Sequence, residues 1–133
     1  MNTKILMVTS AVFMMISGLG LTFIPQEIFE FLNAGLDPSS VLFAQLLGSL
    51  YLGFGMLNWM SKNSVIGGIY NKPLVVGNLA HFLISFFTLI RIVGKPSGNE
   101  FPFILILTTI YTVFTLCFGF VFFKHPNSLK HSN

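Results

Sequence analysis

PLVVGNLAHFLISFFTLIRIV, residues 73–93, is a stretch that is long and apolar enough to cross a bilayer as one helix. It carries polar side chains at spacings of three, four and three residues, namely Asn78, His81, Ser85 and Thr88. On a helix that turns by about 100° per residue, these side chains fall within an arc of about 80°. The stretch is therefore predicted to be a transmembrane helix with one polar stripe.

The composition of the whole chain agrees with a membrane protein and excludes a soluble domain. Hydrophobic residues make up 53% of the 133 residues and charged residues only 8%, and the mean hydropathy is +0.80. A soluble domain carries roughly a quarter charged residues, so this chain could not cover a surface that faces water. The seven basic residues form no cluster, so nucleic acid is not expected as a partner. The single cysteine, Cys117, excludes an intrachain disulfide.

Three further runs without charged residues flank this stretch, at 5–24, 41–60 and 101–123. Each is close to the ~20 residues that a helix needs to cross a hydrocarbon core of about 30 Å. The sequence predicts an all-α membrane protein with four transmembrane helices in an up-down bundle, which form a single domain over residues 1–133. The last residues, 124–133, are polar and are predicted to be a tail.

The connection after the first run carries the signals of a short helix. Pro25 suits a first helical position, Glu27 and Glu30 suit a helix start, and Gly35 suits a stop. Apolar side chains on one side of this segment predict a helix of about residues 25–35 that lies in the membrane interface.

The basic residues set the expected orientation. If both termini lie on one side of the membrane, that side receives five basic residues and the other side receives two. The side that is rich in basic residues is expected to be cytoplasmic, so both termini are predicted to lie in the cytoplasm. The five are Lys4, Lys62, Lys72, Lys124 and Lys130, and the two are Arg91 and Lys95.

Small residues predict how the helices pack, because lipid tails are as apolar as Leu and close approach of backbones must supply much of the contact. The second run holds two small-residue pairs, Ala44 with Gly48 and Ser49 with Gly53. The fourth run holds a seam of small side chains within an arc of about 60°. This seam consists of Thr108, Thr112, Thr115 and Gly119. Such seams favour a closed bundle, but they also serve for homo-oligomers or for a membrane-protein partner, and both uses stay open.

Polar residues of the second and third runs are expected at matching depths, because the two helices run in opposite directions. The expected pairs are Gln45 with Thr88, Ser49 with Ser85, and Asn58 with Asn78. Polar groups at matched depth satisfy each other, and such hydrogen bonds average about 0.6 kcal/mol in a membrane. The same residues are also the candidates for lining a ligand pocket around His81.

His81 lies eight residues beyond Pro73, about 12 Å along the helix and so near the middle of the membrane. An ionisable residue there is a candidate functional residue, although a neutral, hydrogen-bonded imidazole would serve structure alone. No second His and no carboxylate lies in the predicted spans, so no metal and no other cofactor is expected. A haem held by two copies of His81 across a dimer is the remaining alternative. Arg91 and Lys95 lie at the far end of this helix, where contact with lipid headgroups is expected.

Three segments together show a resemblance to a known family: FIPQEIFEFLNAG after the first helix, QLLGSLYLGFGMLNWMSK in the second, and NKPLVVGNLAHF opening the third. This layout resembles the small four-helix bacterial membrane proteins of the DoxX-like and neighbouring families. The resemblance covers nearly the whole chain and rests on Gly-rich helices and on a Pro or Asn at helix starts. It implies a bacterial inner-membrane location and carries over no catalytic residue.

The spans contain no nucleophile motif, no cluster of metal ligands and no pair of carboxylates. The sequence therefore predicts a small integral membrane protein that is not an enzyme and serves as a structural or accessory component. The alternative is a module that binds or transports a lipid-like or quinone-like ligand in a cavity around His81. Membrane lipid is an expected partner in either case.

Overall fold

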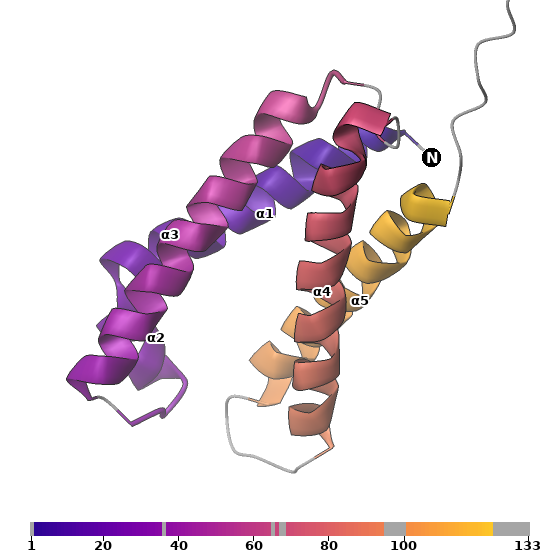
Figure 1. The fold of residues 1–133 in the computed structure, drawn as a ribbon. Coiled ribbons are helices and arrows are strands. Elements are labelled where there is room, and N and C mark those ends of the chain that lie inside the picture. The colour runs from indigo at the N-terminus through magenta and orange to yellow at the C-terminus, as the bar shows by residue number, and fades with distance from the viewer. Residues whose placement is uncertain (1, 36, 65, 67–68, 95–100, 124–133) are drawn as a thin grey trace, which may run out of the picture.

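The computed structural model describes residues 2–35, 37–64, 66, 69–94 and 101–123 of the chain. Within these residues every regular element is helical, which confirms the all-α prediction. Four of these helices are long and apolar enough to cross a membrane: α1 (Thr3–Phe23), α3 (Pro38–Ser61), α4 (Lys72–Val93) and α5 (Phe101–Phe123). They alternate in direction and so form the predicted up-down arrangement (Figure 1). The predicted tail lies outside the described residues.

The long helices begin and end within three residues of their predicted bounds. The largest difference is at the start of α3, where Asp37 caps the helix and Pro38 takes the first helical position. The Asp37 carboxylate accepts hydrogen bonds from the N–H groups of Ser39 (2.8 Å) and Ser40 (3.0 Å). The hydroxyl of Ser40, together with these N–H groups, holds the pKa of Asp37 below its usual range. Capping therefore starts α3 one turn before the apolar run begins.

α2 (Pro25–Phe31) is the short helix predicted between the first two spans, and its place directly after α1 fits an interfacial helix. It ends before the residue that was expected to stop it, so the assignment of Gly35 as the stop is wrong. Asn33 adopts a left-handed φ of 48°, and the N–H group of Ala34 donates to the carbonyl oxygen of Phe29 (2.9 Å). Asparagine tolerates this conformation, which closes the helix and satisfies one of its last carbonyl groups.

α1 and α3 form the first helix pair, and their backbones come close at glycines. A Cβ atom added to Gly48 would lie 2.9 Å from the carbonyl oxygen of Gly18 and 2.9 Å from the backbone nitrogen of Thr22. At Gly55 an added Cβ would lie 3.1 Å from the carbonyl oxygen of Ala11. Only residues without a side chain allow helices to approach this closely, so these glycines determine the packing of the pair.

The structure divides the two small-residue pairs of α3 between its two faces. Ala44 and Gly48 are buried, and Gly48 lies against α1. Ser49 and Gly53 are exposed, and a Cβ atom added to Gly53 would meet nothing within 4 Å. One pair is therefore used inside the chain, and the other lies on the outer face of α3.

α4 and α5 form the second helix pair, which packs through aromatic rings. Phe82 of α4 is fully buried, and its ring stacks on Phe114 and Phe118 of α5 at centroid distances of 4.7 and 5.6 Å. The hydroxyls of Thr108 and Thr112 donate within α5, each at 2.7 Å to the carbonyl oxygen four residues earlier. The α5 seam therefore presents small side chains to its neighbours, but the hydroxyls of Thr108 and Thr112 form hydrogen bonds within α5 and not with another helix.

The two helix pairs meet near the end where α1 begins and diverge toward the end that holds α2 (Figure 1). A 3-10 turn, η1 (Ile69–Asn71), leads into α4. The described lysines all belong to the end where the pairs meet, and they are Lys4, Lys62 and Lys72. The described acidic residues belong to the opposite end, and they are Glu27, Glu30 and Asp37. The described lysines are therefore separated from the described acidic residues along the length of the helices, whereas Arg91, in the last turn of α4, lies at the acidic end.

Candidate functional site

Buried amide groups link the first helix pair to α4. Asn58 of α3 and Asn78 of α4 are fully buried, and each Nδ2 donates to the Oδ1 of the other, at 2.7 and 2.8 Å. Asn58 also donates to Ser10 Oγ on α1 (3.1 Å), and Asn78 donates to the carbonyl oxygen of Leu74 (2.9 Å). The contact predicted between Asn58 and Asn78 is therefore present, and with Ser10 it joins three helices.

A pair of tyrosines provides a second link between the helix pairs. Tyr51 of α3 and Tyr111 of α5 are both buried, and their hydroxyl groups share a hydrogen bond. The ring of Phe13 on α1 meets the ring of Tyr111 edge-on, at a centroid distance of 5.7 Å. Together the two links bring all four long helices into contact. We refer to Ser10, Tyr51, Asn58, Asn78, His81 and Tyr111 as the junction.

His81 lies between these two links and is surrounded by aromatic rings. The centroid of its imidazole is 5.1 Å from those of Tyr51 and Phe82, 5.8 Å from that of Tyr111 and 6.1 Å from that of Phe54. Its Nε2 atom is buried and has no hydrogen-bond partner in the structure. A buried polar atom without a partner costs roughly 1–3 kcal/mol. Nε2 is therefore the atom of the junction at which a polar group of a ligand would be favoured.

Gln45 and Thr88 do not form the contact that their depths predict. The amide of Gln45 donates instead to the carbonyl oxygen of Thr22 on α1, at 3.3 Å. The hydroxyl of Thr88 donates to the carbonyl oxygen of Ile84 in its own helix, at 3.1 Å. Gln45 belongs to the first part of α3 and Thr88 to the last part of α4, and the two helix pairs diverge toward that end (Figure 1).

Ser49 and Ser85 are also not brought together. Ser49 lies on the outer face of α3, and its hydroxyl donates to the carbonyl oxygen of Leu46 at 2.7 Å. Ser85 is partly buried on α4. Of the residues predicted to line a pocket with His81, only Asn58 and Asn78 lie in the junction, and their hydrogen bonds connect them to each other. Arg91 is exposed in the last turn of α4, as headgroup contact requires, and Lys95 lies outside the described residues.

Three junction residues are missing from the sequence-based set: Ser10, Tyr51 and Tyr111. Depth would have indicated the two tyrosines. Tyr51 lies ten residues from the end of α3 and Tyr111 twelve from the end of α5, which places both about 15–18 Å from the same end of the bundle. His81 lies nine residues, or about 14 Å, from that end. A search that treated tyrosine hydroxyls as polar groups would therefore have grouped these three side chains.

Among the described residues, no three His, Cys, Asp or Glu side chains lie close enough to hold a metal ion. The junction offers amide and hydroxyl hydrogen bonds, aromatic rings and one buried imidazole nitrogen. Comparisons of the chain with protein-family models, with curated proteins and with solved structures find no match. The resemblance to DoxX-like proteins therefore stays a prediction from the sequence.

Proposed function

We propose that this chain is a non-enzymatic integral membrane protein that serves as a structural or accessory component of a larger membrane assembly. Its partner is a transmembrane helix of another membrane protein, which packs on the outer face of α3. The proposed location is the bacterial inner membrane, which the resemblance to DoxX-like proteins implies. Both termini are proposed to lie in the cytoplasm, an orientation that the distribution of basic residues favours.

The observation that carries this proposal is a groove along the outer face of α3. The groove has a volume of about 760 Å³ and contains Ser49 and Gly53, the small-residue pair that α1 does not use. It extends from Leu46 to Met60, about 20 Å along the helix axis and so most of a hydrocarbon core of about 30 Å. Its lining residues are Leu46, Ser49, Leu50, Gly53, Phe54, Met56, Leu57 and Met60. A second helix could approach the backbone of α3 closely at Gly53.

The amides of the junction support the structural part of the proposal. Asn58 and Asn78 form hydrogen bonds with each other. Asn58 also bonds to Ser10, and Asn78 also bonds to a backbone carbonyl group. Groups that are satisfied in this way hold helices in register and are not available to a substrate. The junction therefore positions α3 so that its outer face is presented to the membrane.

Site-specific photocrosslinking tests the proposed partner. A photoreactive benzoyl-phenylalanine replaces Leu50 in the groove or, as a reference, Leu116, which is exposed on α5. We expect the probe at position 50 to form a crosslink that mass spectrometry maps to a transmembrane helix of one other protein. The probe at position 116 should not form it.

Two substitutions make this experiment specific for the groove. Gly53→Leu fills the floor of the groove and is expected to lower the crosslink at least tenfold. Ala80→Leu introduces the same side chain at an exposed position of α4 outside the groove and should leave the crosslink intact, as should His81→Gln. A crosslink that survives Gly53→Leu, or one that maps to a second copy of this chain, would contradict the proposed partner.

A second candidate function is the binding of a quinone-like ligand at His81. The observation that favours it is the buried Nε2 atom without a hydrogen-bond partner, next to the paired hydroxyls of Tyr51 and Tyr111. A quinone carbonyl could accept a hydrogen bond from Nε2–H while its ring stacks among the aromatic side chains.

Titration with decylubiquinone tests this second function. We expect the Hε1 resonance of His81 to shift saturably in NMR spectra, because the carbonyl group of the quinone would lie beside the imidazole. The resonances of His125 and His131 serve as internal references. A His81 resonance that does not move at saturating quinone would exclude the ligand at this position.

A further inference from the structure

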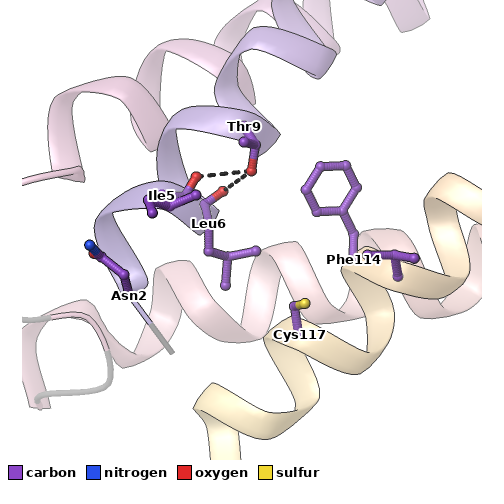
Figure 2. Close-up of a pocket in the computed structure, with 7 residues that line it drawn as sticks. Asn2, Ile5, Leu6, Thr9, Phe114 and Cys117 are labelled. Atoms are coloured by element: carbon purple, nitrogen blue, oxygen red, sulfur yellow. Dashed lines mark hydrogen bonds between the residues drawn. The ribbon is translucent and has the colours of Figure 1, made fainter.

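A second hollow lies between the first turns of α1 and the second half of α5, on a different part of the molecule from the α3 groove (Figure 2). It has a volume of about 290 Å³. Figure 2 shows the side chains of Leu6, Phe114 and Cys117 around the space between the two helices. The complete lining is Asn2, Ile5, Leu6, Thr9, Val113, Phe114 and Cys117.

The polar side chains of this hollow are already bonded to the backbone. The hydroxyl of Thr9 donates to the carbonyl oxygens of Ile5 (2.9 Å) and Leu6 (3.1 Å), as the dashed lines in Figure 2 mark. The side chain of Asn2 accepts a hydrogen bond from the N–H group of Lys4 (3.1 Å). What remains inside the hollow is apolar surface, so the part of a ligand that enters it must be hydrocarbon.

The size of the hollow fits a single hydrocarbon chain better than a helix. On α1 it extends from Asn2 to Thr9, which is about 10 Å along the axis and roughly two-thirds of one membrane leaflet. A transmembrane helix would need contact along most of the hydrocarbon core, as the α3 groove offers, whereas this shorter hollow suits part of one acyl chain.

The charges around the mouth of the hollow favour an anionic headgroup. Lys4 is exposed in the first turn of α1, at the same end of the helix as the lining residues Asn2 and Ile5, although it does not itself line the hollow. Lys72 begins α4 at the same end of the helices, and its Nζ atom lies 5.8 Å from the centroid of the Phe122 ring near the end of α5. The described acidic residues lie at the opposite end of the helices. A basic residue close to the membrane surface attracts anionic lipids by about 1 kcal/mol.

We propose that this hollow is a binding site for one anionic phospholipid of the leaflet on the side of the N-terminus. One acyl chain lies in the hollow, along Leu6, Phe114 and Cys117. The phosphate group lies at the mouth, at the level of Lys4 along the helix axis. The site holds a lipid in the seam between α1 and α5, where the two helix pairs make little direct contact, and it is independent of the proposed partner of α3.

Native mass spectrometry of the full chain tests whether the hollow holds the acyl chain. The protein is depleted of lipid in detergent and titrated with phosphatidylglycerol or phosphatidylcholine of identical acyl chains. We expect wild type to retain one phosphatidylglycerol. Val113→Phe, which fills the hollow from an exposed position, should lower its retention at least tenfold. Leu116→Phe, at another exposed position of α5, should leave retention unchanged. Equal retention by both variants would overturn the acyl-chain site.

Substitutions of lysine test the headgroup. Lys4→Gln should lower the preference for phosphatidylglycerol over phosphatidylcholine about fivefold, the effect of one basic residue at the surface. Lys4→Arg should keep the preference. Lys62→Gln, at the same end of the helices but next to α3, which does not line the hollow, should keep it as well. A preference that Lys4→Gln leaves unchanged would overturn the assignment of Lys4.

The reaction rate of Cys117 reports on the hollow in the wild-type chain, so this test needs no substituted protein. Cys117 lines the hollow and is a free thiol in the wild-type chain. We expect phosphatidylglycerol to slow its reaction with an apolar maleimide at least threefold, and to do so at lower concentrations than phosphatidylcholine. A reaction rate that lipid does not change would contradict occupancy of the hollow. If a second copy of the chain or a partner helix is captured at Cys117, the occupant of the hollow is a protein and not a lipid, which would contradict the proposal.

Discussion

Single polar residues determine where the helices of this protein meet. Asn58 and Asn78 lie at matching depths on neighbouring helices, and two hydrogen bonds connect them. Depth is readable from the sequence because each residue advances a helix by about 1.5 Å, and this is why the contact was predictable. Gln45 and Thr88 also match in depth, yet they do not meet, because depth gives no information on how far apart two helices lie.

A double-mutant cycle on Asn58 and Asn78 measures the strength of this contact. Asn58→Leu is expected to lower the free energy of unfolding by roughly 1–3 kcal/mol, because it leaves the buried Oδ1 atom of Asn78 without its hydrogen-bond donor. The double variant with Asn78→Leu should lose less than the sum of the single variants, with a coupling energy between about 0.6 and 2 kcal/mol. Reversible unfolding in mixed micelles of mild detergent and dodecyl sulfate gives these values.

The control for this cycle is Thr109→Val. Thr109 is exposed on α5 and donates only to the carbonyl oxygen of Leu105 in its own helix (2.9 Å). Its substitution should change stability by less than about 0.5 kcal/mol. Strictly additive effects of the two asparagine substitutions would show that the amides do not stabilise each other.

At the scale of one helix, α3 shows what a sequence pattern leaves open. Both of its small-residue pairs have the same spacing, and apolar residues surround both of them. In water the inner face of a helix is apolar and the outer face polar, but a membrane helix is apolar on both faces. Hydrophobic periodicity therefore could not assign Gly48 to α1 and Gly53 to the outer face, and only the arrangement of the helices does so.

Two alanine substitutions on α3 distinguish these faces. Gly48→Ala is expected to destabilise the protein by roughly 1–3 kcal/mol, because its Cβ would overlap the backbone of α1 at Gly18 and Thr22. Gly53→Ala should leave stability unchanged or raise it by up to about 1 kcal/mol, because the position is open and alanine favours a helix. Thermal unfolding in detergent measures both. A Gly53→Ala variant that is as unstable as Gly48→Ala would contradict the assignment of the two faces.

For the whole molecule, the order and direction of the helices were predictable and their pairing was not. Four long apolar runs with short connections require an up-down order. Which helices then pack most closely depends on side-chain shape, such as the stacking of Phe82 on Phe114 and the glycine contacts of α1 with α3. These contacts depend on residues far apart in the chain, and the small-residue seams alone are compatible with several pairings.

Cysteine labelling tests the proposed orientation of the whole molecule in the membrane. In a Cys117→Ser background, Ser39→Cys is expected to react with a membrane-impermeant maleimide added to intact spheroplasts. Ser64→Cys should react only after the membrane is permeabilised, because the connection that contains Lys62 is predicted to be cytoplasmic. The background variant alone serves as the control for non-specific labelling, and the reverse pattern would invert the proposed topology.

The pairing of α1 with α3 and of α4 with α5 also bears on how the protein is made. Each pair is encoded by one continuous half of the chain. The contacts of Gly18, Gly48 and Gly55 across the first pair therefore need no residue of α4 or α5. Insertion into the membrane can then proceed as two successive hairpins, and the hydrogen bonds of the junction form last. Two separately translated halves, divided between α3 and α4, are accordingly expected to reassemble when they are produced in the same cell.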